Sequence, residues 1–213
     1  MSLRYELSNQ IIETCLEMNR SGLNQGTSGN VSVRYQDGML ITPSGIPYSK
    51  LSPDQIVYVD GNGKSPETNK IPSSEWRFHL DILKSRPDLH AVVHTHAIHC
   101  TALSILNREI PPLHYMIVAS GSSYIPCVPY ATYGSSELSQ HVVEGFRKSK
   151  AILMQHHGMI AAEVRLDKAL WLAHEVEVLA SLMIKLLPLG EVPLLSDSDI
   201  QAAMAKFSTY GLK

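Results

Sequence analysis

The N-terminal part of the chain contains the pattern of a β-hairpin, and this pattern strongly limits the possible folds. Val31, Val33 and Tyr35 alternate with polar residues, Asp37-Gly38 predicts a tight turn, and a second apolar strand begins at Met39. Alternation at every second residue is typical of a strand with one buried face, and a tight turn makes its two strands antiparallel. The hairpin therefore argues against an all-parallel, doubly wound sheet.

The other expected helices and strands follow one another without regular alternation. Apolar residues at helical spacing predict helices, and short apolar runs predict buried strands. One serine of Ser73-Ser74 should cap a helix, with Glu75 in its first turn, where the helix dipole favours a negative charge. The expected helices cover residues 3–20, 72–85, 98–106, 135–149, 166–187 and 196–207, and the further strands cover residues 56–59, 91–96, 151–156 and 159–163.

These elements predict an α/β protein that forms a single three-layer α-β-α domain over residues 1–213. Helices should cover a central mixed, largely antiparallel sheet. The length suits one domain, and hydrophobic residues, at 44%, are sufficient to fill its core. No repeat or linker divides the chain.

Charge and hydropathy exclude several kinds of partner. The chain has 18 Lys and Arg against 20 Asp and Glu, a formal charge of −2, without a basic run, so no nucleic-acid partner is expected. The longest apolar stretch, residues 179–189, is interrupted by Lys185 and Pro188, so no membrane partner is expected. The N-terminus lacks an apolar signal region, and we therefore expect a cytoplasmic protein.

Histidines provide the strongest functional signal in the sequence. His94 and His96 are two residues apart on an expected strand, so both side chains should project from one face and could share a metal ion. His157, at the expected end of another strand, is the best candidate for a third ligand. Glu75 could supply an oxygen ligand or act as a general base.

A histidine pair of this kind can also be purely structural. Two strand histidines can simply bond to their neighbours, and a glutamate at a helix start usually has only a structural role. His156 should point to the opposite strand face from His157. The other histidines are expected in surface or core roles: His79, His90, His99, His114, His141 and His174.

Three further segments offer backbone N–H groups and hydroxyls that suit an anion. They are Gly26-Thr27-Ser28-Gly29-Asn30, Thr42-Pro43-Ser44-Gly45 and Ser73-Ser74. Each one alone could be an ordinary turn or cap. The P-loop and dinucleotide-binding glycine patterns are missing. The residues themselves thus indicate a candidate metal site and a candidate phosphate pocket.

Taken together and in order, these motifs resemble the class II aldolase/adducin family. The resemblance covers nearly the whole chain and rests on five motifs: Gly26-Thr27-Ser28-Gly29-Asn30, Thr42-Pro43-Ser44-Gly45, Pro72-Ser73-Ser74-Glu75, His94-Thr95-His96 and Gln155-His156-His157-Gly158. Five ordered motifs form a specific signal. The family forms homotetramers with active sites between subunits, and the resemblance implies the same assembly here.

The resemblance also implies roles for individual residues. His94, His96 and His157 would hold one zinc ion per subunit, and Glu75 would complete the zinc ligands when no substrate is bound. Tyr115 would reach the site from a neighbouring subunit. Tyr133, which stands where the family usually has Phe, and Tyr210 would line an aldehyde pocket. The implied phosphate-binding residues are Thr27, Gly29, Asn30, Ser44, Gly45, Ser73 and Ser74.

The implied reaction is the reversible cleavage of the sugar phosphate L-fuculose 1-phosphate to dihydroxyacetone phosphate and L-lactaldehyde. A divalent cation would stabilise the negative charge left when the C3–C4 bond breaks. Glu75 would transfer the proton at C3, and Tyr115 would exchange a proton with the C4 oxygen. The alternatives are cleavage of L-rhamnulose 1-phosphate, 4-epimerisation of L-ribulose 5-phosphate, and a non-catalytic adducin-like interaction module, in which the metal ligands should be degraded.

Overall fold

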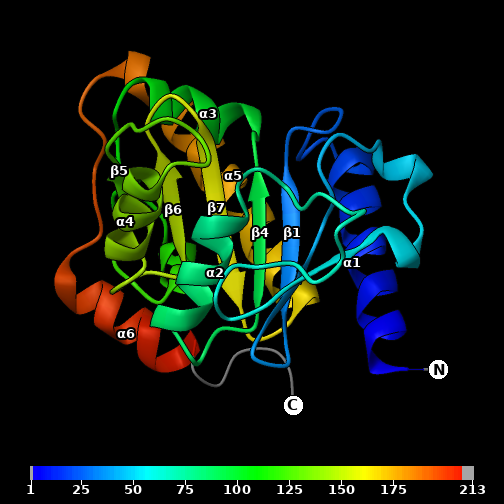
Figure 1. Ribbon diagram of the computed structural model, residues 1–213. Coiled ribbons are helices and arrows are strands. Elements are labelled where there is room, and N and C mark those ends of the chain that lie inside the picture. The colour runs from blue at the N-terminus through cyan, green and yellow to red at the C-terminus, as the bar shows by residue number, and fades with distance from the viewer. Residues whose placement is uncertain (1, 208–213) are drawn as a thin grey trace.

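The computed structural model describes residues 2–207, which form a seven-stranded sheet with helices on both faces (Figure 1). The strand order is β3-β2-β1-β4-β7-β6-β5; β5 and β6 are parallel, and the other neighbouring strands are antiparallel. The strands are β1 (Asn30–Tyr35), β2 (Gly38–Ile41), β3 (Val57–Val59), β4 (Ala91–Thr95), β5 (Cys127–Val128), β6 (Ala151–Met154) and β7 (Gly158–Glu163). The expected mixed, largely antiparallel sheet is confirmed.

The helices form a layer on each face of the sheet. The α-helices are α1 (Leu3–Arg20), α2 (Trp76–Ser85), α3 (Ile98–Ile105), α4 (Ser136–Gly145), α5 (Leu166–Leu186) and α6 (Asp197–Phe207), and the 3₁₀ helices are η1 (Tyr48–Lys50), η2 (Pro53–Gln55), η3 (Tyr115–Ser120) and η4 (Leu187–Leu189). In Figure 1, α2 and α4 lie in front of the sheet, and the core of α1, α3, α5 and α6 lies on the other face. Among the described helices, none is both long and apolar enough to cross a membrane.

The β1–β2 hairpin forms where it was predicted, but its turn lies one residue earlier. Tyr35 pairs with Gly38, so Gln36 and Asp37 form the two-residue loop, and Gln36 has a left-handed φ of 52°. A Cβ atom on Gly38 would lie 2.0 Å from the carbonyl oxygen of Val59 on β3. Gly38 therefore permits the close approach of β3 rather than the turn.

Strand β4 lies near the middle of the sheet and determines where the candidate ligands stand. His94 is opposite Asn30 on β1 and opposite Ile160 on β7. Val92 packs in the core on the α2–α4 face, whereas Val93 packs in the core on the other face. Because His94 and Val92 are two residues apart, His94 projects towards α2. This direction confirms the face that the alternation predicted.

The start of α2 differs from the expectation. Glu75 occupies the N-cap position that we predicted for a serine, and its side chain makes no capping hydrogen bond. Ser73 Oγ instead accepts a bond from the Glu75 N–H at 3.3 Å, just before the helix. The predicted serine cap is therefore wrong, and the Glu75 carboxylate is free for other contacts.

Helix α4 ends at Gly145, four residues before its predicted end. Arg86 Nη1 donates to the carbonyl oxygens of Phe146 (2.6 Å) and Ser149 (3.5 Å). The Phe146 side chain is fully buried in the core between α2, α4 and the sheet. The helix stops here because a neighbouring cation satisfies carbonyls that further helical turns would otherwise bond.

The N-terminus of α3 is closed by a side chain from α5. Glu177 accepts bonds from the backbone N–H groups of His99 and Cys100, both at 3.0 Å, and from His99 Nδ1 at 2.7 Å. Ala97, the N-cap residue, makes no side-chain capping bond. Since α3 begins two residues after His96, this contact also anchors the chain that leaves β4.

We expect Glu177→Ala to lower the free energy of unfolding by about 1–2 kcal/mol, because two backbone N–H groups lose their acceptor. Glu177→Gln keeps one acceptor oxygen, so its free energy of unfolding should fall clearly less. Urea unfolding followed by circular dichroism measures both variants. Losses of equal size would contradict the capping role.

Candidate active site

Three histidine side chains converge at one end of the sheet. His94 is on β4, His96 follows its last residue, and His157 lies in the turn between β6 and β7. Their ring centroids are 4.9–5.0 Å apart, and one nitrogen of each ring lies within 4.8 Å of the others. The Nε2 atoms of His94 and His96 are 3.1 Å apart. Two nitrogens on a tetrahedral zinc ion lie about 3.3 Å apart, so the spacing suits such an ion.

The hydrogen bonds and the burial of these rings also suit a metal ion. His94 Nδ1 lies 2.9 Å from the carbonyl oxygen of Met159 and must donate to it, so Nε2 is the nitrogen that faces the cluster. Burial, together with the neighbouring rings of His94 and His157, lowers the pKa of His96 to about 3. His96 therefore presents a neutral, metal-binding ring, and His94 turns Nε2 towards the same point.

Glu75 adds a carboxylate to the three rings. Its Oε2 lies 3.2 Å from His94 Nε2, and its Oε1 lies 3.1 Å from His157 Nε2. Burial alone would raise the pKa of Glu75, but the adjacent His94 and His157 hold it below its ordinary value, so the group is ionised. Oε1 is buried and has no hydrogen bond of good geometry. A buried carboxylate oxygen that lacks a well-formed hydrogen bond and lies beside three imidazoles belongs to a donor set that a cation would satisfy.

Two glycines allow the backbone to pack tightly around the cluster. A Cβ atom on Gly158 would lie 2.6 Å from the Thr95 carbonyl oxygen and 3.0 Å from the ring of His96. A Cβ atom on Gly29 would lie 2.5 Å from the carbonyl oxygen of His94. Any larger residue at either position would push a candidate ligand out of place.

Asn30 makes a contact that the sequence did not predict. Its Nδ2 donates to Glu75 Oε2 at 2.8 Å, and its Oδ1 lies 2.5 Å from Nε2 of His79, which is fully buried on α2. The sequence suggested only a surface or core role for His79. Its position on the α2 face that carries Phe78 and Ile82 gave no sign that it reaches the cluster.

A cavity of about 330 Å³ opens beside the histidines. Its wall includes five residues for which the sequence predicted a site role: Ser74, Glu75, His96, Tyr133 and His157. Four more residues line it: Ser28, from a segment that the sequence predicted to suit an anion, Ala131, from the segment of Tyr133 that was predicted to line the aldehyde pocket, and Tyr130 and His156, which were not predicted as site residues. These four lie in loops, where periodicity gives no information on direction.

The expected direction of His156 is wrong. Strand β6 ends at Met154, so His156 is not a strand residue, and it has a left-handed φ of 55° in the turn. Its side chain is exposed and lines the same cavity as His157. The turn removes the strict alternation that the prediction assumed.

Two of the predicted phosphate-binding segments are neighbours. The Ser44 N–H donates to the Ile71 carbonyl, and the Ser73 N–H donates to the Thr42 carbonyl, both at 3.0 Å. These amides are therefore already bonded within the protein. The exposed hydroxyls of Ser44 and Ser74 stay free to meet a ligand at the N-terminus of α2, where the helix dipole favours an anion.

The other predicted phosphate-binding residues differ in exposure. Thr27 and Gly45 are exposed, whereas Gly29 and Asn30 are buried. Thr27 shares its loop with Ser28, which lines the cavity. Their phosphate-binding roles stay predictions.

The two remaining tyrosines lie apart from this group. Tyr115, on η3, is 55% exposed and is not among the residues that line the cavity within its own chain. Tyr210 lies outside the described residues. Their roles also stay predictions.

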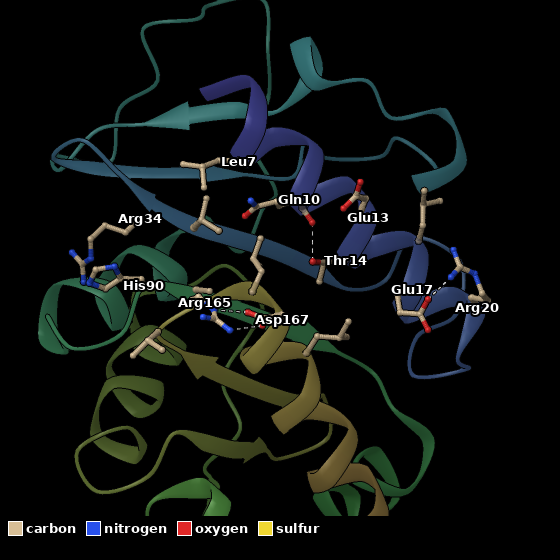
Figure 2. A pocket seen from close by; sticks show the side chains of 16 residues that line it. Leu7, Gln10, Glu13, Thr14, Glu17, Arg20, Arg34, His90, Arg165 and Asp167 are labelled. Carbon is tan, nitrogen blue, oxygen red and sulfur yellow. Dashed lines mark hydrogen bonds and ion pairs between the residues drawn. The ribbon is translucent and has the colours of Figure 1, made fainter. Parts of the chain in front are cut away.

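A larger hollow of about 770 Å³ lies between α1 and the start of α5 (Figure 2). On its wall, Arg165 pairs with Asp167 at 2.7 Å, and Arg20 pairs with Glu17 at 2.5 Å. These four charges neutralise one another locally. Among the described residues, the group that could hold a metal ion is the three-histidine cluster and not this hollow.

The fold and the cluster agree with the comparison to known protein families. The family described as the Class II Aldolase and Adducin N-terminal domain matches residues 9–184. The chain therefore belongs to the class II aldolase and adducin family, as its five motifs predicted.

Individual relatives indicate that the chain is one of the enzymes of this family. It is 64% identical over 211 residues to the L-fuculose phosphate aldolase of Escherichia coli (strain K12), with 99% of this chain and 98% of the relative covered. It is 59% identical over 211 residues to the 5-methylthioribulose-1-phosphate/5-deoxyribulose-1-phosphate aldolase of Escherichia coli O45:K1 (strain S88 / ExPEC), with 99% of each covered. A solved structure of an L-fuculose 1-phosphate aldolase matches with a TM-score of 0.93 and 32% identity over 98% of each chain. The chain is a class II aldolase, and hence a lyase.

His157→Ala should remove a metal ligand and leave less than about one tenth of the wild-type metal content, because two imidazoles and a carboxylate bind a divalent ion weakly. His156→Ala is the matched control: it removes the adjacent imidazole and should keep the full metal content. Elemental analysis after dialysis measures both variants, and circular dichroism checks their folding. Full metal content in His157→Ala would refute the ligand assignment.

Proposed function

We propose that this chain is a zinc-dependent aldolase that reversibly cleaves L-fuculose 1-phosphate to dihydroxyacetone phosphate and L-lactaldehyde. The observation that carries the proposal is the convergence of three imidazoles and a buried carboxylate beside one cavity. The full-length identity to a relative named as an L-fuculose phosphate aldolase supports this substrate. The adducin-like alternative required degraded ligands, whereas all four candidate ligands are present here.

Zinc, at one ion per subunit, is the metal that the residues suit best. Three imidazole nitrogens and one carboxylate oxygen make four donors, a common zinc set. His94, His96, His157 and Glu75 would hold the ion. When bound, the ion would act as a Lewis acid on the ketone oxygen of the substrate.

Glu75 and Tyr115 would handle the protons. When the C3–C4 bond breaks, the C4 hydroxyl loses its proton and becomes the aldehyde, and C3 gains a proton to give dihydroxyacetone phosphate. Tyr115 would take the C4 hydroxyl proton, and Glu75, buried beside the imidazoles, would deliver the proton to C3. The hydroxyls of Ser44 and Ser74 would hold the phosphate, and Tyr133 would contact the aldehyde end from the cavity wall.

A homotetramer with sites between subunits would bring Tyr115 to the cavity. Tyr115 is exposed and does not line the cavity of its own chain. Large apolar side chains on α3 are also exposed, namely Ile98 (58%) and Ile105 (53%). Exposed aromatic and aliphatic side chains of this kind suit a subunit contact.

A second candidate substrate follows from the relative that is 59% identical. Its name specifies 5-methylthioribulose 1-phosphate and 5-deoxyribulose 1-phosphate. These compounds share the ketose 1-phosphate end with L-fuculose 1-phosphate and differ in the aldehyde that they release. The same metal and Glu75 would serve all three.

The first test is release of dihydroxyacetone phosphate in a coupled assay. We expect release from L-fuculose 1-phosphate, abolition by a chelator and recovery on addition of zinc, because the charge that develops needs a Lewis acid. The comparison substrates are the two ribulose 1-phosphates above, L-rhamnulose 1-phosphate and L-ribulose 5-phosphate. Faster release from another ketose 1-phosphate would identify that compound as the better substrate. Conversion of L-ribulose 5-phosphate without release of a triose phosphate would indicate an epimerase.

A subunit-mixing experiment tests the shared site. Glu75→Gln should lose proton exchange at C3, whereas Tyr115→Phe should lose bond cleavage more than this exchange. If each site takes Glu75 and Tyr115 from different subunits, mixed oligomers of the two variants should recover activity at about a quarter of their sites. Mixed oligomers as inactive as their parents would show that both residues act within one chain.

A further inference from the structure

A chain of buried hydrogen bonds runs from β1 through α2 to Glu75. Ser32 Oγ lies 2.8 Å from His79 Nδ1, His79 Nε2 lies 2.5 Å from Asn30 Oδ1, and Asn30 Nδ2 lies 2.8 Å from Glu75 Oε2. All four residues are buried, with His79 and Ser32 at 0% exposure. Neither Asn30 nor His79 lines the cavity beside the cluster.

The direction of every bond in this chain follows from Glu75. Asn30 Nδ2 is the atom that donates to Glu75 Oε2, so the amide turns its NH₂ group towards Glu75 and its oxygen towards His79. The Asn30 oxygen can only accept, so His79 Nε2 must carry a hydrogen. In a neutral ring Nδ1 is then an acceptor, and Ser32 Oγ–H donates to it.

The surroundings of His79 keep its ring neutral and fixed. Burial, assisted by the nearby His94, lowers the pKa of His79 to about 3. The ring stacks on Phe78, with centroids 4.8 Å apart and planes 19° from parallel. Both ring nitrogens have a partner, so the ring cannot flip without loss of two buried hydrogen bonds.

We infer that His79 is a positioning residue for Glu75: its Nε2–H locks the Asn30 amide in the orientation that presents a donor to the carboxylate. This role rests on the proposed function of Glu75 as the group that transfers the C3 proton. Without His79 the amide could rotate and turn its oxygen towards Oε2, where two acceptors would repel. Glu75 would then lose the contact that holds it when its other oxygen acts on substrate.

Two substitutions of His79 distinguish the role of its Nε2 atom from that of its Nδ1 atom. Glutamine can place a side-chain N–H near the position of Nε2 and keep the bond to Asn30. Asparagine is shorter and can only replace Nδ1. It therefore keeps a hydrogen-bond partner for Ser32 but loses the hydrogen bond to Asn30. The zinc-loaded enzyme is incubated with dihydroxyacetone phosphate in deuterium oxide, and the exchange at C3 is followed by NMR.

We expect His79→Asn to slow this exchange about ten- to hundred-fold, the usual cost of an outer-shell partner, and His79→Gln to restore most of it. KM should change little, because His79 does not line the cavity. Most of the metal content should be kept, because His79 bonds none of the three ligand histidines and reaches Glu75 only through Asn30. Ile82→Ala creates a cavity on the same helix without removing a member of the hydrogen-bonded chain, and it controls for loss of stability.

A second comparison shows whether His79 acts through Glu75. In the Glu75→Gln background, His79→Asn should cause no further loss of exchange, because the group that it positions is already gone. A further loss of exchange in that background would overturn the inference. So would equal losses of exchange in His79→Asn and His79→Gln, or a loss in His79→Asn no larger than that in Ile82→Ala. Absence of exchange in the wild type would overturn the proposed function, whereas wild-type exchange that both His79 variants retain would overturn the inference alone.

The hydrogen-bond direction has its own readout, independent of activity. In protein labelled with ¹⁵N-histidine, the His79 signals are identified by their loss in His79→Gln. They should report a hydrogen on Nε2 and a bare Nδ1, unchanged between about pH 5 and pH 8 because the ring stays neutral. A hydrogen on Nδ1 would overturn the inferred direction of the chain.

Discussion

The pairing of β4 with β1 on one side and β7 on the other is the constraint on which the site depends. It places His94 opposite Asn30 and Ile160, and it fixes which face of the sheet His94 occupies. A shift of one residue in either register would turn His94 into the opposite core, away from Glu75. The same pairing brings the β6–β7 turn beside the end of β4, where Gly158 packs against Thr95 and His96. The histidine cluster is thus a consequence of sheet register, and the absence of side chains at Gly29 and Gly158 lets the strands come close enough.

Electrostatics adds a second constraint to this geometry. Glu75 is a buried anion, and an unpaired buried charge is costly, so its position must be compensated. The compensation comes from several directions: the start of α2, Asn30 on β1, and the imidazoles of His94 and His157. Among the described residues, no Lys or Arg lines the cavity. A cation bound there would meet the carboxylate of Glu75 and the imidazole nitrogens of the three histidines, a donor set that favours tight binding and Lewis-acid activity.

Periodicity predicted the parts of this structure that depend on local sequence. The alternation around Val33 gave the hairpin, and the spacing of His94 and His96 gave their common face. The predictions fail where contacts between distant parts of the chain determine the local structure. The φ of 55° at His156 ends β6 early and turns that side chain to the cavity, which a strand pattern cannot show. Arg86 ends α4 from another element, and the contacts of His79 and Asn30 join residues 49 positions apart. The resemblance to a family found the candidate ligands together, but not the hydrogen bonds that hold them.

Under the proposed function, the rigid and variable parts of the site divide the substrate between them. The groups that would act on the ketose phosphate come from β4, the start of α2 and the β6–β7 turn, all tied to the sheet by backbone hydrogen bonds. The groups that would face the aldehyde, Tyr130, Ala131 and Tyr133, lie in the loop between β5 and α4. Substitutions in that loop can change the shape of the pocket without a shift of register or a buried charge. Relatives whose names specify different aldehyde ends of a ketose 1-phosphate can therefore share one fold and one metal cluster. Specificity in this architecture is a property of the loops, whereas catalysis is a property of the sheet.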